Sequence, residues 1–235
     1  MIAVGHQPQY LPYMGLFNKI AKGDIFVFVD NVQFLKKSWQ SRTLVKGING
    51  QEILMSIPVQ VKGKFCQQIK DVLIAEGFLI KKHLKTIEFN YRKTTGFDEV
   101  YPIIAKYYKS NIKYLVDITI PLMREMFSLL NIEKTIFIGS ELGIEKTKTE
   151  LLVDICLKTG ADSYLSGQGA RNYITPDLFG KIKLSHYRNI FKHPHYSQTG
   201  KDFSTGMATL DLLFNEGIQN SRKIFWDNVS QNSYE

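Results

Sequence analysis

The sequence contains few cysteines, no long apolar run and no block of like charge. No segment approaches the roughly 18 consecutive apolar residues of a membrane span, and no signal peptide precedes the first apolar run. Cys66 and Cys156 stand alone, without the spacing of a metal or redox motif. We therefore expect a cytoplasmic protein with two free thiols, no metal site and no membrane span.

The net charge is +8, but the positive residues are scattered. They come singly or in pairs, such as Lys36-Lys37 and Lys81-Lys82, and no known nucleic-acid module accompanies them. A basic solvated surface or an anionic small ligand explains this charge, so we expect no nucleic-acid partner. The sequence does not indicate the oligomeric state.

The first thirty residues predict a strand, a polar loop, a helix and a second strand. Apolar residues 2–4 lead into the loop of residues 6–13, apolar spacing continues over 14–20, and residues 25–29 form an apolar run that ends at Asp30. In an open parallel sheet, ligands bind where strands end and helices begin. The polar loop is therefore the expected place for a site.

The middle of the chain predicts a β-hairpin followed by helices. Two apolar runs flank Asn49-Gly50, which favours a type I′ turn. Helical spacing follows over residues 80–91, 101–110 and 113–130, and Pro121 is expected to kink or end the last of these. We interpret residues of about 43–130 as a hairpin plus a helical insertion or lid.

The last third returns to alternating strands and helices. Thr147 and Glu150 form a capping-box pattern before a helix, and Gly217 is expected to close the last helix. The expected elements cover residues 135–138, 151–158, 163–165, 183–187 and 207–214. Such alternation predicts an α/β fold with a mainly parallel, Rossmann-like sheet, in a single domain over residues 1–235.

The first loop and the second strand carry the acid–base candidates. His6 has an imidazole that titrates near neutral pH and is the expected catalytic base. Asp30 follows the neighbouring strand and would either orient that imidazole or bind a ribose hydroxyl. Gln7 would donate a hydrogen bond to an oxyanion.

Three groups of residues are candidates for binding an anionic substrate. Lys36 and Arg42 would hold a pyrophosphate, and Trp39 or Tyr10 would stack on a planar ring. A glycine-rich loop after a strand brings Ser166, Gln168, Asn172 and Tyr173 as possible phosphate contacts. Tyr196 and Gln198 complete the set of polar candidates.

These residues also carry a family resemblance. The opening His6-Gln-Pro-Gln-Tyr-Leu-Pro12 resembles the WbqC-like family, as do Asp24–Asp30, Tyr164–Gly167, Tyr196-x-Gln198 and Leu210–Gly217. The matches extend over about residues 1–217. Ser41 stands where the family usually has asparagine, so one polar contact differs from the family pattern.

The resemblance implies a bacterial role in O-antigen or capsule biosynthesis. It suggests an N-formyltransferase that moves a formyl group from N10-formyltetrahydrofolate to the amine of a dTDP- or UDP-linked dideoxy amino sugar. Two alternatives remain open at this point. One is an ATP-dependent amide ligase, for example for glycine, or another N-acyltransferase on an amino sugar. The other is a non-catalytic protein that binds nucleotide sugars.

Overall fold

The core of the molecule is a parallel sheet with the strand order β5-β2-β1-β6-β7. The computed structural model describes residues 1–109, 112–169, 176–231 and 233–235. The parallel strands are β1 (Ile2–His6), β2 (Ile25–Phe28), β5 (Thr135–Ile138), β6 (Ser163–Ser166) and β7 (Ser185–Arg188). The predicted α/β class with a Rossmann-like parallel sheet is confirmed.

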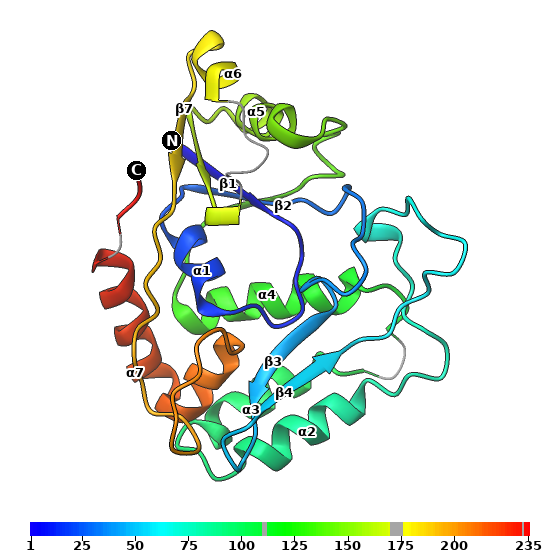
Figure 1. Cartoon of the computed structure of the whole chain (residues 1–235), viewed down its shortest axis with the longest axis vertical. Helices are drawn as coiled ribbons and strands as arrows, with labels where there is room; N and C mark the ends of the chain where they lie inside the picture. Colours follow the sequence, from blue (N-terminus) through cyan, green and yellow to red (C-terminus); the bar gives the residue numbers. More distant parts are fainter. Residues whose placement is uncertain (110–111, 170–175, 232) are drawn as a thin grey trace.

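Both faces of this sheet are covered by helices, because alternate strand residues point into two separate apolar clusters. Val4, Phe26 and Phe28 belong to one cluster, whereas Ala3 and Val27 belong to the other. The first cluster is covered by α1 (Met14–Ala21), α4 (Val116–Leu130) and α7 (Thr209–Gln231), and the second by α5 (Lys148–Thr159) and α6 (Pro176–Lys181). Figure 1 shows α5 and α6 on one side of β1 and β2, with α1 and α4 on the other.

The predicted hairpin forms a separate antiparallel sheet of β3 (Arg42–Lys46) and β4 (Glu52–Ser56). Its connection differs from the predicted type I′ turn, because Gly50 has a left-handed φ of 86° and Asn49 does not. The loop spans residues 47–51 and packs against Gly200. A Cβ on Gly200 would lie 2.5 Å from the Gly50 Cα, so this contact requires glycine.

The helical middle begins with a short 3₁₀ turn, Ile69–Asp71, and continues with α2 (Lys81–Tyr91) and α3 (Phe97–Ala105). These elements and the hairpin extend the larger apolar cluster away from the sheet, below it in Figure 1. Pro121 lies inside α4 and does not end it. Gly217 breaks α7 with φ 71° and ψ 167°, as predicted, but a further helical segment that the sequence did not predict continues to Gln231.

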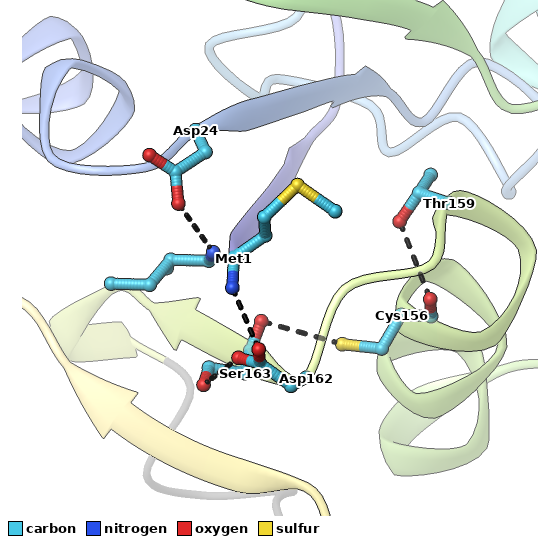
Figure 2. Close-up of polar contacts among 7 residues, drawn as sticks. Met1, Asp24, Cys156, Thr159, Asp162 and Ser163 are labelled. Carbon is cyan, nitrogen blue, oxygen red and sulfur yellow. Dashed lines mark hydrogen bonds and ion pairs between the residues drawn. The ribbon is translucent and has the colours of Figure 1, made fainter.

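The start of β1 is held between the two neighbouring strands. The Met1 amino group donates to Asp162 Oδ2 at 2.7 Å, and the Ile2 amide donates to Asp24 Oδ2 at 2.8 Å (Figure 2).

Nearby, burial raises the pKa of the Cys156 thiol to about 12. The Cys156 sulfur is therefore protonated at neutral pH and contributes no thiolate nucleophile.

A buried carboxylate connects the hairpin, α2 and α7. Asp211 is fully buried and accepts hydrogen bonds from Tyr91 Oη at 2.7 Å, Tyr196 Oη at 3.0 Å and Gln198 Nε2 at 2.8 Å. The Lys46 amide in turn donates to Tyr91 Oη at 2.8 Å. Tyr196 and Gln198, which the sequence predicts as substrate contacts, are thus engaged with Asp211 inside the protein.

The network predicts a large stability effect at Tyr91. Tyr91→Phe removes the donor to Asp211 and the acceptor for the Lys46 amide, and both partners are buried. The free energy of unfolding should fall by about 1–3 kcal/mol, measured by urea denaturation. Tyr101→Phe is the matched control, because its hydroxyl meets Glu88 at 3.3 Å in an exposed contact. Equal losses in both variants would contradict a buried network.

Candidate functional site

A cavity of about 730 Å³ lies at the carboxyl ends of β1 and β6. The chain leaves β1 through α1 toward β2 on one side, whereas β6 pairs with β1 on the other, so the sheet order reverses between these strands. Open α/β sheets bind ligands at such a reversal. The lining contains His6 at the end of β1 and Gln7 after it, Ser166 at the end of β6 and residues 167–169 after it, and Thr147 and Lys148 at the start of α5.

The loop after β1 is fixed by its backbone and by one buried tyrosine. The Leu11 carbonyl accepts from Thr43 Oγ1 at 2.7 Å, and the Pro12 carbonyl accepts from Thr209 Oγ1 at 2.8 Å. Tyr10 is fully buried and its hydroxyl lies 3.0 Å from both His83 Nδ1 and Tyr108 Oη. Tyr10 therefore anchors the loop, which corrects its predicted role in stacking on substrate.

His6 lines the cavity as a neutral imidazole. Its Nδ1 lies 2.9 Å from the Gln7 carbonyl oxygen, and because that oxygen can only accept, Nδ1 carries the proton. The lone pair is therefore on Nε2. Burial, and after it the charge of Lys19, lowers the pKa of His6 to about 3. The ring can accept a proton or a hydrogen bond at Nε2 throughout the neutral range.

Lys19 is the main site residue that the sequence analysis missed. It lies on α1 among apolar neighbours, is 5% exposed and lines the cavity. Its Nζ donates to the Gly5 carbonyl at 3.2 Å and passes alongside Gly167 at the end of β6. Burial lowers the pKa of Lys19 to about 7, so its charge changes near neutral pH. The available signal was a lysine within a short helix whose other residues, apart from Asn18, are apolar or glycine.

The orientation of the Gln7 side chain is set by Gln40, which is also buried. Gln40 Nε2 donates to Gln7 Oε1 at 2.6 Å, and Gln40 Oε1 accepts from the Leu35 amide at 3.0 Å. Both polar ends of Gln40 are thereby used. The Gln7 oxygen is occupied, and its amide NH₂ is the end that can donate to a ligand in the cavity. Gln40 is a positioning residue that the sequence did not indicate.

Asp30 does not orient the imidazole of His6, contrary to the prediction. Its carboxylate is 4% exposed and accepts from the Ser140 amide at 2.8 Å and from Ser140 Oγ at 2.7 Å. Asp30 thus holds the turn after β5, two residues beyond the end of β2. The physical reason is position: the strands are parallel, but His6 pairs with Phe28, so Asp30 lies farther along the edge.

The predicted pyrophosphate and stacking residues lie outside the cavity lining. Lys36 is exposed and its Nζ lies 5.4 Å from the centre of the Phe65 ring. Trp39 is 52% exposed, and Arg42 Nη1 donates to the Lys37 carbonyl at 3.5 Å. Leu35, from the same loop, does reach the cavity. The structure therefore brings this loop to the rim without bringing its cations inside.

The glycine-rich loop contributes part of the cavity as predicted. Ser166 and Gln168 line it, and Ser166 Oγ lies 3.0 Å from His186 Nε2. Asn172 and Tyr173 lie outside the described residues. Opposite this loop, α5 begins at the cavity, and Thr147 makes no side-chain capping bond, which corrects the predicted capping box. A helix start with a lysine beside it favours anions such as phosphate.

Comparison with known proteins shows the family of this chain. The model of the WbqC-like protein family matches residues 7–223. The chain belongs to the WbqC-like protein family. This WbqC-like protein is 30% identical to the "Uncharacterized protein Rv1507c" of Mycobacterium tuberculosis over 218 residues, which cover 91% of this chain and 93% of that one. No solved structure gave a significant match.

Among the helices in the described residues, none combines the length and apolar character needed to cross a bilayer. Within the same part of the chain, no three histidine, cysteine or acidic side chains gather as a metal-binding group. The polar groups at the cavity include the imidazole of His6, the amine of Lys19, the side-chain amides of Gln7 and Gln168, and the start of α5.

The geometry predicts that His6 stays neutral well below its ordinary pKa. In ¹⁵N-labelled protein at pH 5, the His6 imidazole should show the Nδ1–H tautomer by NMR. Because its pKa falls from 6.5 to about 3 on folding, the unfolded chain binds the extra proton between these values. Folding stability should therefore decrease as pH falls through that window, more steeply than in His6→Asn. A protonated ring at pH 5 would contradict this assignment.

Proposed function

We propose that this protein is an N-formyltransferase that acts on a nucleotide-linked amino sugar. N10-formyltetrahydrofolate would be the formyl donor, and the acceptor would be the amine of a dTDP- or UDP-linked dideoxy sugar. The observation that carries the proposal is the pairing of a neutral His6 with a buried Lys19 in one cavity at the sheet reversal. The family resemblance supports the choice of substrate class.

The start of α5 is the proposed site for the nucleotide phosphates. Lys148 and Thr147 line the cavity there, and Lys148 has a left-handed φ of 51°, which is uncommon for a residue with a side chain. Amide groups and the helix dipole at such a start attract phosphate oxygens. Across the cavity, Gly167 and Gly169 leave room for a close backbone approach.

The reaction needs one proton acceptor and one group that stabilises negative charge. The sugar amine attacks the formyl carbon and forms the new C–N bond, while His6 Nε2 accepts the amine proton. The bond from the formyl carbon to N10 then breaks, and the proton returns to N10 of tetrahydrofolate. The Gln7 amide and the Lys19 ammonium group would stabilise the oxyanion of the tetrahedral adduct.

Bound phosphates would adjust the low pKa of His6 to its proposed role as the acceptor of the amine proton. A base with a pKa of about 3 is weak, but nearby negative charge favours the protonated form of histidine. Pyrophosphate at the start of α5 would therefore raise the pKa of His6 toward neutral. The base would reach its working strength when the acceptor nucleotide sugar is in place.

A second candidate is an ATP-dependent amide ligase on the same kind of amine. The observation that favours it is the start of α5 with Lys148, which suits a triphosphate as well as a sugar-linked diphosphate. The two candidates differ in what they consume. The ligase needs ATP and an amino acid, whereas the formyltransferase needs the formyl-folate and no ATP.

The direct test is an assay with several dTDP- and UDP-linked amino sugars. With N10-formyltetrahydrofolate, mass spectrometry should detect a product heavier by one formyl group, together with free tetrahydrofolate. Parallel reactions contain ATP and glycine in place of the folate. Amide formation in those reactions alone would replace the proposal with the ligase, and binding of nucleotide sugars without turnover in either would exclude both.

The same assay tests the two central residues. His6→Asn should lower kcat by about 10²–10⁴-fold, because the amine proton loses its acceptor. Lys19→Met should lower kcat by about 10²–10³-fold through loss of oxyanion stabilisation. Binding of the nucleotide sugar, measured by calorimetry, should change little in His6→Asn. His195→Asn is the control, since His195 is exposed and outside the lining. Full activity of His6→Asn would contradict the mechanism.

A further inference from the structure

Two surface loops beside the cavity pack against each other and present apolar and basic side chains. The Phe34 amide donates to the Gln67 carbonyl at 2.9 Å, and Gln33 Nε2 donates to the Phe65 carbonyl at 2.8 Å. These bonds join the loop of residues 33–40 to that of residues 60–68. We define the rim patch as Leu35, Lys36, Lys37, Trp39, Lys62, Lys64 and Phe65.

The three apolar members of the rim patch are all exposed. Phe65 is 73% exposed, Leu35 54% and Trp39 52%. Scattered single apolar residues are normal on a protein surface, but a group of large ones on adjoining loops marks an interaction site. The loop that carries Phe65, cyan in Figure 1, reaches the right-hand edge of the molecule. The apolar side chains of the patch are therefore open to solvent.

The charged side chains of the rim patch are all positive. All four lysines of the rim patch are exposed. Residues 31–70 contain a single acidic residue, Glu52, which lies on β4. The Lys36 Nζ stays near the Phe65 ring, at 5.4 Å from its centre, so charge and apolar surface are interleaved. A partner for this surface must offer negative charge next to apolar material.

We propose that the rim patch docks reversibly on an anionic lipid bilayer. Tryptophan and phenylalanine favour the membrane interface, and lysines near an anionic surface add attraction from the phosphate headgroups. A folded nucleic acid meets the charge requirement but offers no apolar layer for Leu35. Because Gln33 and Leu35 also line the cavity, docking places the cavity beside the bilayer surface.

The proposal extends beyond the formyltransferase function and does not depend on it. The test is co-sedimentation of the full chain with phosphatidylcholine vesicles that contain or lack phosphatidylglycerol. Binding should require phosphatidylglycerol and weaken with salt. Trp39→Ser with Phe65→Ser should reduce partitioning at least tenfold. Lys36→Gln with Lys37→Gln should reduce it by about fivefold for each lysine removed.

A matched control is available on α2. Phe89 is 58% exposed and shares the helix with the exposed Lys81 and Lys82. Phe89→Ser combined with Lys81→Gln and Lys82→Gln removes one exposed aromatic ring and two positive charges from a different surface. This variant should bind vesicles as the unmodified chain does. Loss of binding in the α2 variant, with normal binding of the rim variants, would overturn the proposal.

Trp39 also provides a direct optical readout. The second tryptophan, Trp226, donates from Nε1 to the Leu130 carbonyl at 2.9 Å, so Trp226→Phe leaves Trp39 as the single indole. In that variant, phosphatidylglycerol vesicles should shift the emission to shorter wavelength, and brominated lipid should quench it. Unchanged emission, or binding to single- or double-stranded DNA in place of vesicles, would also overturn the proposal. Formyl transfer to a soluble nucleotide sugar is measured without vesicles, so the two proposals fail independently.

Discussion

The reversal of strand order between β1 and β6 is the constraint on which the site depends. Two parallel strands whose connections diverge leave their carboxyl ends uncovered, and here those ends carry His6 and Ser166. The other site groups line the cavity at these strand ends. Lys19 reaches it from α1, α5 begins at the same cavity, and the loop after β1 holds Gln7 in place. Without the reversal, these groups would have no common space.

Burial then determines the electrostatics of the gap. His6 and Lys19 are both bases, and removal from water favours the neutral form of each. Their mutual repulsion acts in the same direction, since the charge of Lys19 further lowers the pKa of His6. The empty cavity therefore holds less positive charge than two bases in water would carry. An anionic ligand reverses this balance, which makes the protonation of the site dependent on what occupies it.

The fold could be predicted because the spacing of apolar residues along the chain is regular. The residues of the candidate site could be predicted only in part. Buried strands such as β2 and the amphipathic helix of residues 80–91 are local patterns. His6, Gln7, Ser166 and Gln168 lie at or just after the ends of strands, and that position indicated the cavity. Tyr10, Asp30, Tyr196 and Gln198 are polar too, but their partners are distant in sequence, so no local pattern could separate anchoring from binding. Lys19 was missed because burial of a lysine is a tertiary property.

The anchoring of the first loop by the last helix has a consequence for biogenesis. Pro12 is held by Thr209, and 197 positions separate the two residues. A nascent polypeptide emerges from its amino end. The loop after β1 therefore leaves the ribosome long before Thr209, which holds it, has been translated. Contacts of such separation also carry a high loop-closure cost and form slowly. The geometry of the candidate site is therefore among the last features to be completed during synthesis, after the scaffold that surrounds it.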